Sequence, residues 1–565
     1  MSDEIFKKNA PVPREYQRRI AETAMNENAL VVLPTGMGKT LIALLVMARH
    51  LSAGKKVILL APTKPLAEQH KKTIVELTNA DQNRVILITG ETPAKKRSEM
   101  WANAIIALAT PQTLENDLKQ GRASLEGVGL VVFDEAHRCV GKYAYTYVAG
   151  KCHGAGARVL ALTASPGSDE RKIRAIMETL GIKKVEIRGE EDEDVKEYVQ
   201  PVSVKWIEVE LPDSIEGMRF RLEKLIESRA GMFVKLGLVG NPKKISKRKL
   251  IELRGRIDRS GGGWKYAALS RYAELFNLLH AHELLETQGV GTFLDFFARM
   301  GEREEKSKAV ARLLADGELA GILEMARNSD VEHPKMEKLA GLIRERAGKT
   351  FIVFVQYRDQ IRRIVEELAK VPGLKPVRFV GKKDGVSQKE QKETIARFRA
   401  GEFNVLVATQ IGEEGLDIPS VDCVIFYEPV PSEIRSIQRR GRAGRTRAGE
   451  VIVLVTKGTR DETYYWVSKR KEKRMKRTIE KIRGEGASGT GRRDGHGRRE
   501  DAAGESGLAG RERVERGGAG SEEEVARIGG TGSAGGPVSS SKEKVLKEGQ
   551  GKERTGGQTR ITDYG

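Results

Sequence analysis

The stretch Val31-Val-Leu-Pro-Thr-Gly-Met-Gly-Lys-Thr40 decides how the first part of this 565-residue chain is expected to fold. The apolar run Ala29–Leu33 predicts a short buried strand, and the apolar run Leu41–Ala48 predicts a helix. A glycine-containing turn between a strand and a helix N-terminus forms a phosphate cradle, because unpaired backbone N–H groups and the helix dipole favour an anion there. The residues expected to line this cradle are Pro34, Thr35, Gly36, Met37, Gly38, Lys39 and Thr40.

The chemistry expected of the cradle rests on its last two residues. Lys39 is expected to reach the β- and γ-phosphates of a nucleotide, and the Thr40 hydroxyl is expected to bind Mg²⁺. The strict pattern has a glycine six residues before the lysine, whereas Leu33 stands there in this chain. Upstream, Gln17 is a candidate for paired hydrogen bonds to the adenine edge, with an ordinary surface residue as the alternative. The sequence therefore predicts ATP and Mg²⁺ as cofactors.

A second motif follows an apolar strand. Leu130-Val-Val-Phe-Asp134-Glu135-Ala-His137 places two adjacent acids at the end of that strand. Asp134 is expected to hold Mg²⁺, and Glu135 is expected to polarise the attacking water. His137 is expected to relay between the nucleotide and the second half of the chain. A helix cap is the alternative for two such acids, and the cradle upstream favours the catalytic interpretation.

Residues 1 to about 200 alternate short apolar runs with helical stretches, which predicts a parallel sheet flanked by helices with ligands at its carboxyl edge. The expected strands are Ala29–Leu33, Val57–Ala61, Val85–Thr89, Ile105–Ala109, Leu130–Phe133, Val159–Thr163 and Val185–Ile187. Polar residues at further strand ends can hold a nucleic-acid backbone or form plain turns. They are Pro62 and Thr63, Thr110 and Gln112, and Thr163 and Ser165, of which the last two are expected to couple the acids to strand binding.

Bulk composition indicates a polyanionic partner. The net charge is +20, which favours nucleic acid over a membrane. The three cysteines, Cys139, Cys152 and Cys423, lack paired ligand spacing, so neither a zinc site nor a disulfide framework is indicated. The polar N-terminus shows no signal peptide, and no uncharged apolar run reaches transmembrane length, so no membrane partner is expected.

Between about Leu211 and Asp330 the pattern changes to helical periodicity. His280 and His282 lie in this segment without the spacing or the third ligand of a metal site. A densely basic stretch is expected to contact phosphates, with a solvated helix face as the alternative. It contains Lys243, Lys244, Lys247 and Arg248.

Strands return from about Val331 and predict a second α/β domain. They are expected at Phe351–Val355, Val377–Val380, Val405–Ala408, Val424–Phe426 and Val451–Val455. Gln356 follows the first of these strands and Thr409 the third, and both are expected to contact nucleic acid. Asp417 is expected to bind ribose or to orient an arginine.

The stretch Gln438-Arg-Arg-Gly-Arg442-Ala-Gly-Arg445 carries the strongest signal of the second domain. The planar guanidinium keeps its charge and suits phosphate oxygens, so Arg442 and Arg445 are expected to stabilise the transferring phosphoryl group across a cleft. Gln438 is expected to couple the two domains. A nuclear-localisation or RNA-binding run is the alternative, which the preceding Asp417 loop disfavours.

Together these motifs resemble those of superfamily 2 DEAH-box helicases. The segments that match the family's ATP and coupling motifs, in its order, are Pro34–Thr40, Asp134–His137, Thr163–Ser165, Thr409–Asp417 and Gln438–Arg445. More narrowly, the chain is similar to the archaeal Hef helicases and their eukaryotic FANCM relatives. That similarity lies in Leu59–Leu66, Ala109–Leu118, Val132–Arg138, Leu162–Ser168 and Tyr427–Gln438.

The resemblance implies an α/β fold with two RecA-like parallel-sheet motor domains, at 1–205 and 331–482, and a DNA-gripping helical insert at 206–330. It implies ATP-driven remodelling of forks and Holliday-type junctions, with branched DNA as the partner. The implied location is the nucleoid-associated cytoplasm of an archaeon or the nucleus of a eukaryote. Hef-type proteins often continue into a nuclease, but no matching cluster follows residue 480. No intrinsic nuclease is therefore expected, and a separate nuclease is a candidate partner.

The composition from residue 483 to 565 is rich in Gly, Ser and charged residues, which predicts a disordered tail. Near its end, Gln558, Ile561 and Tyr564 have the spacing of a sliding-clamp (PCNA) binding box, in which an aromatic and an aliphatic side chain fill an apolar pocket. Gly565 stands where a second aromatic is usual, and a chance match is the alternative.

Two other functions remain open from the sequence. One is an ATP-dependent binder of double-stranded RNA of the innate-sensor kind. The other is a non-hydrolysing scaffold that recruits a nuclease, which the intact Glu135, Arg442 and Arg445 disfavour.

Overall fold

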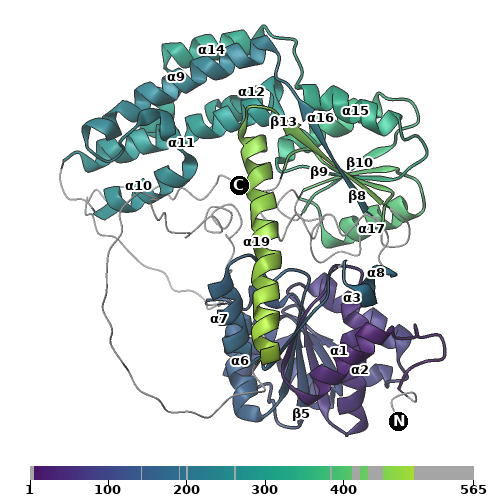
Figure 1. The fold of residues 1–565 in the computed structure, drawn as a ribbon. Coiled ribbons are helices and arrows are strands. Elements are labelled where there is room, and N and C mark those ends of the chain that lie inside the picture. Colours follow the sequence, from purple (N-terminus) through teal and green to yellow (C-terminus); the bar gives the residue numbers. More distant parts are fainter. Residues whose placement is uncertain are drawn as a thin grey trace, which may run out of the picture. The chain divides into compact units, whose positions relative to one another are not determined.

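The structure is a computed structural model that describes residues 5–141, 143–189, 191–198, 202–259, 263–381, 385–409, 420–429 and 449–488. The chain divides into two compact units. The first unit contains residues 1–224, 280–307 and 311–493 and holds both sheets, whereas the described residues of the second are 225–259, 263–279 and 308–310. Figure 1 labels the elements of each unit.

The first sheet has seven strands in the order β3-β4-β2-β5-β6-β1-β7, and its neighbours all pair in parallel. Its strands are β1 (Ala29–Val32), β2 (Lys56–Leu60), β3 (Val85–Ile88), β4 (Ile106–Ala109), β5 (Val128–Phe133), β6 (Arg158–Thr163) and β7 (Lys184–Ile187). Most of these strands are continuous apolar runs, as expected where helices cover both faces of a parallel sheet. The carboxyl ends of β2, β5, β6 and β1 therefore adjoin at one edge of the sheet.

Helices cover the two faces of this sheet (Figure 1). One face is covered by α1 (Glu15–Asn26), α2 (Lys39–Ser52) and α3 (Lys64–Leu77), and the other by α5 (Pro111–Lys119), α6 (Ala144–Ala155) and α7 (Glu170–Leu180). The other described helices of this part are η1 (Gln82–Arg84), α4 (Ala94–Asn103), η2 (Ala136–Arg138) and α8 (Glu193–Lys196).

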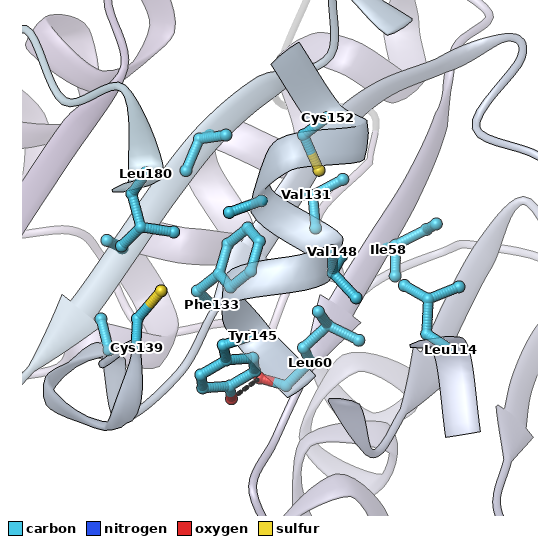
Figure 2. Packing of buried hydrophobic residues seen from close by; sticks show 14 of the residues in the cluster. Ile58, Leu60, Leu114, Val131, Phe133, Cys139, Tyr145, Val148, Cys152 and Leu180 are labelled. Atoms are coloured by element: carbon cyan, nitrogen blue, oxygen red, sulfur yellow. Dashed lines mark hydrogen bonds between the residues drawn. The ribbon is translucent and has the colours of Figure 1, made fainter. Parts of the chain in front are cut away.

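Figure 2 shows the core on the α5–α7 face. The ring of Phe133 on β5 packs edge-on against Tyr145 on α6, with 5.2 Å between the ring centroids. The Tyr145 hydroxyl donates to the carbonyl oxygens of Leu60 and Asp134, at 3.2 and 2.6 Å. This buried phenol therefore holds the ends of β2 and β5 together from inside the core.

The second sheet has six strands in the order β10-β11-β9-β12-β13-β8, again paired in parallel. They are β8 (Val202–Val209), β9 (Phe351–Phe354), β10 (Pro376–Phe379), β11 (Val405–Ala408), β12 (Cys423–Phe426) and β13 (Gly449–Thr456). One face packs on α15 (Pro334–Arg344) and α16 (Arg358–Ala369), and the other on α17 (Gln388–Arg399). The last described helix is α19 (Arg460–Ser488), which contacts β13 and then β7 of the first sheet.

The segment between the two sheets is helical, as its periodicity predicts. Its elements are α9 (Asp213–Lys235), η3 (Pro242–Lys244), α10 (Lys247–Arg259), α11 (Lys265–Gln288), α12 (Val290–Gly301), α13 (Lys308–Leu314) and α14 (Gly317–Arg327). Both α9 and α11 have residues in each of the two compact units.

The expected strands are present, with ends that shift by no more than two residues, and two features differ from expectation. The boundary expected between residues 205 and 206 falls inside β8, and β8 pairs with β13 of the second sheet along its whole length. The tail expected from residue 483 begins as helix, because α19 continues to Ser488. Residues 489–565 lie outside the described residues.

Candidate functional site

The cradle lies at the carboxyl end of β1, between that strand and α2. The Leu33 N–H donates to the Thr163 carbonyl oxygen at 3.1 Å, which ties the start of the loop to β6. Gly36 and Gly38 have φ values of 88° and 77°, a left-handed backbone that favours glycine. A Cβ on Gly38 would also lie 2.3 Å from Nε2 of Gln17. Both the backbone and the space around it therefore require glycine at position 38.

Lys39 is the first residue of α2, and its side chain turns back over the loop. Its Nζ donates to the carbonyl oxygens of Leu33 and Pro34, at 2.9 and 3.2 Å. Thr40 follows in the first turn of α2 and is half-buried. Because the first-turn N–H groups of a helix have no acceptor within it, this end of α2 is suited to an anion.

Two buried side chains of α1 support the cradle. The Tyr16 hydroxyl and the Gln17 Nε2 both donate to the Met37 carbonyl oxygen, at 2.8 and 3.1 Å. The Gln17 Oε1 accepts from the Arg14 N–H at 2.9 Å, and Gln17 is only 3% exposed. The amide that is predicted to read an adenine edge is thus bonded at both ends to the protein's own atoms. Its adenine contact stays a prediction.

Asp134 lies at the carboxyl end of β5 and is 7% exposed. Its Oδ2 accepts from Nε2 of His70 at 2.8 Å, and its Oδ1 accepts from the Glu135 N–H at 3.0 Å. Burial raises the pKa of Asp134, but the hydrogen bond and charge of His70, with the charge of Lys39, outweigh burial and hold this pKa below its ordinary value. The carboxyl group is therefore an anion at neutral pH, as a magnesium ligand must be.

Glu135 has a strained backbone. Its φ and ψ are 50° and 49°, and among the described residues it is the non-glycine residue with positive φ. Left-handed backbone at such a residue costs on the order of 1–3 kcal/mol and clusters at functional sites. The Glu135 Oε2 lies 3.3 Å from Nδ1 of His137, which also lies 3.1 Å from the Thr163 hydroxyl. The structure thus brings the second acid next to His137, which in turn contacts Thr163.

The contacts continue from Thr163 to α19. The Thr163 hydroxyl donates to the Ser165 carbonyl oxygen at 3.0 Å and accepts from the Ser165 N–H at 3.1 Å. The Ser165 hydroxyl in turn donates to the sulfur of Met475 at 2.9 Å. Three of the four predicted coupling residues, His137, Thr163 and Ser165, therefore form one connected set that reaches the last described helix.

The predicted nucleic-acid residues of the first domain stand at two helix starts. Thr63 and Thr110 are the N-cap residues of α3 and α5; Thr110 directly follows β4, and Thr63 lies three residues after the end of β2. The Thr63 hydroxyl is buried without a hydrogen-bond partner in the described part of the chain, whereas the Thr110 hydroxyl lies 2.8 Å from that of Thr113. Pro62 is buried and Gln112 is exposed. Their contacts with nucleic acid stay predictions.

In the second domain, Gln356 and Thr409 follow β9 and β11, which are neighbours in the sheet. Gln356 is exposed and its N–H bonds to the Glu428 carboxylate, whereas Thr409 is 7% exposed. The remaining predicted residues of this domain and the tail lie outside the described residues. They are Asp417, Gln438, Arg442, Arg445, Gln558, Ile561 and Tyr564.

The basic stretch of the insert belongs to the second compact unit. Lys243 is exposed on η3, where Lys244 follows it, and Lys247 begins α10. The Arg248 Nε donates to the Glu252 carboxylate at 3.2 Å on the same helix. The predicted phosphate contacts of these residues stay a prediction.

His70 is the site residue that sequence reasoning missed. It lies on the buried side of α3 with Ala67 and Ile74, at helical spacing. A polar residue at a core position of an amphipathic helix requires a buried partner, so this spacing was the available signal.

Other site types find no support among the described residues. They contain no group of three or more His, Cys, Asp or Glu side chains arranged to hold a metal ion. Cys139, Cys152 and Cys423 are buried free thiols, and burial raises the pKa of each to about 12. No helix in the described ranges has the length and apolarity needed to cross a bilayer.

Known helicases match the chain over both sheets. Residues 14–173 match the family described as DEAD/DEAH box helicase, and residues 334–447 match the helicase conserved C-terminal domain. The crystal structure of the Pyrococcus furiosus Hef helicase domain is 42% identical with a TM-score of 0.64, and the match covers 81% of this chain and 98% of that one.

Curated relatives match most of the chain but are longer. The protein MJ1505 of Methanocaldococcus jannaschii, whose name reads "Putative ATP-dependent RNA helicase", is 40% identical over 482 residues, or 83% of this chain and 61% of the relative. The ATP-dependent DNA helicase mph1 of Neurospora crassa is 34% identical over 493 residues, and fml1 of Schizosaccharomyces pombe is 32% identical over 481. These matches cover 81% and 79% of this chain, and 42% and 57% of the relatives.

Proposed function

The chain belongs to the Hef and FANCM family of superfamily 2 DEAD/DEAH-box helicases, and from this premise we propose that it is an ATP-dependent DNA helicase that remodels branched DNA. One observation carries the proposal. The cradle of α2 and the acids of β5 lie at the same edge of the first sheet, where the charge of Lys39 acts on Asp134.

The residues at this edge fit ATP with Mg²⁺. Gly36 and Gly38 have no Cβ to obstruct the phosphates, and Asp134 is kept anionic by His70 and Lys39. In the proposed mechanism Lys39 and the first N–H groups of α2 hold the phosphates, and Thr40 and Asp134 hold the metal. Bound Mg²⁺ supplies positive charge that stabilises the transferring phosphoryl group.

Glu135 is proposed to orient the attacking water and to accept its proton. Its contact with His137 supports a link from hydrolysis to Thr163 and Ser165. Arg442 and Arg445 are proposed to complete the site from the second domain, and Gln438 and Asp417 to assist them.

DNA is proposed to contact the starts of α3 and α5, the ends of β9 and β11, and the basic insert. The support is positional, because Thr63 and Thr110 cap helices at the edge that also holds the nucleotide residues. Cycles of ATP binding and hydrolysis would then move these contacts along a strand.

The proposal is tested by ATP hydrolysis with forked DNA and with duplex RNA of equal length. Wild type and K55A, which removes an exposed lysine just after α2, should be stimulated more by forks than by duplex RNA. K39A should lose hydrolysis and nucleotide affinity, whereas E135Q should keep nucleotide binding and lose turnover. Stronger stimulation by RNA would instead support an RNA-dependent translocase, as the name of the Methanocaldococcus relative suggests.

A sliding clamp and a separate nuclease are proposed partners, with the nucleoid or the nucleus as the place of action. The support for the clamp is the spacing of Gln558, Ile561 and Tyr564 at the chain end. Binding of the full chain to purified PCNA should be lost in Y564A. Equal binding by wild type and Y564A would reject this motif.

A further inference from the structure

The exposed side of α19 carries a line of side chains that none of the roles above uses. Trp466, Arg470, Lys473 and Arg477 are exposed and follow one another at helical intervals. At 3.6 residues per turn and 1.5 Å per residue, they form one stripe roughly 16 Å long. We call these four residues the α19 stripe. Further exposed cations flank the stripe at Lys469, Arg474 and Lys476.

The side of α19 opposite the stripe is buried, and this determines which side of the helix is exposed. Ser468, Met475, Thr478 and Ile482 are each less than a tenth exposed and share one face of the helix. Met475 belongs to the core of the first sheet, and Lys481 pairs with Glu170 of α7 at 3.0 Å. Because α19 is held on this side, the stripe lies on its exposed side.

An aromatic cluster lies at the N-terminal end of the stripe. The rings of Trp206 on β8 and Tyr465 have centroids 3.9 Å apart, and those of Tyr465 and Trp466 are 4.8 Å apart. The Nζ of Lys469 lies 5.3 Å from the Tyr465 ring centroid and 5.8 Å from that of Trp206. Trp466 is the exposed member, at 49%. A large aromatic side chain held in place by neighbours, with one face in water, is suited to stacking.

The cations of the stripe are not neutralised by the protein. Within the described residues no acidic side chain forms an ion pair with Arg470, Lys473 or Arg477. Other surface cations of this chain do pair along their helices, as Lys119 does with Glu115. Like charges three and four residues apart repel and weaken a helix, and a bound polyanion removes that repulsion. Among the described side chains near the stripe, Glu472 is half-buried between Arg470 and Lys473, and the exposed Glu480 lies beyond the C-terminal end of the stripe.

We propose that the α19 stripe binds a DNA strand, with phosphates on Arg470, Lys473 and Arg477 and an unpaired base stacked on Trp466. The proposal rests on the proposed function for the choice of DNA. Charge complementarity and an aligned stacking surface are the two features that single-strand binding requires. An anionic membrane is disfavoured because interfacial helices present a broad apolar face, whereas this stripe offers one aromatic residue.

The test measures binding of the full chain to forked DNA with single-stranded arms over a range of salt concentrations. The variant R470A/K473A/R477A keeps helix propensity and the buried side of α19. It should bind DNA more weakly at low salt. The negative slope of log association constant against log salt concentration should become shallower by about 2 to 3, the value for three lost phosphate contacts. The control K95A/K96A/K183A removes the same charge from exposed positions of the first domain and should lower the slope by less than one. ATP hydrolysis without DNA should match wild type in both.

Two further measurements keep the proposal open to refutation. W466A should weaken binding to single-stranded arms by roughly 5- to 150-fold, the range for one stacked base, while W466F and blunt duplex DNA should be little affected. An unchanged slope in the stripe variant, with forks still stimulating hydrolysis, would overturn the inference and leave the proposed function standing. Loss of binding to anionic vesicles with unchanged DNA binding would assign the stripe to a membrane and would also overturn it. If DNA stimulates ATP hydrolysis neither in wild type nor in any variant, the proposed function is wrong.

Discussion

Removing the imidazole of His70 should raise the Mg²⁺ requirement of nucleotide binding. In the structure, Asp134 has two hydrogen bonds to its carboxylate, one from His70 and one from the Glu135 N–H. H70A leaves a carboxylate that is 7% exposed with one of these partners. A hydrogen bond to a charged group is worth about 1.5–3 kcal/mol, which corresponds to roughly a 10- to 150-fold change in an equilibrium constant. Asp134 should therefore be held less firmly in the orientation that binds the metal.

The assay is equilibrium binding of a fluorescent ATP analogue at a series of Mg²⁺ concentrations, together with hydrolysis. H70A should shift the half-saturating Mg²⁺ concentration upward by at least tenfold, while binding measured without Mg²⁺ changes little. H70Q is the matched variant, because its side-chain amide can donate to Asp134 and should restore most of the shift. The reasoning is wrong if H70A and wild type, both shown to be folded, have the same Mg²⁺ dependence.

Two other predictions follow from the backbone and from an ion pair. G38A and G54A both place alanine on left-handed backbone, at φ of 77° and 69°, and each should lower the free energy of unfolding by about 1–2 kcal/mol. Only G38A, whose Cβ would meet Gln17, should also lose ATP affinity. Thermal unfolding will measure the loss of stability, and nucleotide binding will measure the loss of affinity. Hydrogen bonds from Arg346 lower the pKa of Glu450 to about 2, although burial acts in the opposite direction. The carboxylate therefore stabilises the fold fully when the pH is above its unfolded pKa near 4.5, and this stabilisation is lost as the pH falls toward 2. E450Q should therefore lower the melting temperature most at pH 5 and above, and the difference from wild type should shrink toward pH 3; a difference that is constant with pH would contradict the assignment.

The parts that the sequence predicts well are those whose signal is local. The cradle and the two acids each follow a buried strand directly, and parallel strands bring their carboxyl ends to one edge whatever lies between them. Lys39, Asp134 and Thr163 therefore meet as a consequence of strand order alone. His70 was missed because its partner is far along the chain, and helical spacing reveals burial without naming what a buried polar group bonds.

Strand β8 shows why a domain border is hard to predict from sequence. Most of its residues are exposed or partly buried, and Lys205 and Glu208 lie among them, so it lacks the continuous apolar run that marks the other parallel strands. It lies at the edge of the second sheet, where β13 is its one partner among the described strands. A strand that follows the first domain in sequence therefore joins the second domain by pairing, and composition gives no sign of where such a crossing occurs.

The border between the second domain and the tail, which lies within helix α19, is equally hard to predict from composition. Its exposed residues have the Lys, Arg and Glu content of a disordered segment, and its buried face is limited to a few residues such as Met475 and Ile482. Those few contacts suffice because the first-sheet core and the Ser165 hydroxyl receive Met475. Packing of these few residues against the first-sheet core stabilises the helix, and residues 483–488 are the part of it that falls in the segment expected as tail. Because the contacts of α19 with the first-sheet core lie on its buried face, Trp466, Arg470, Lys473 and Arg477 stay exposed, and the α19 stripe is available to a polyanion.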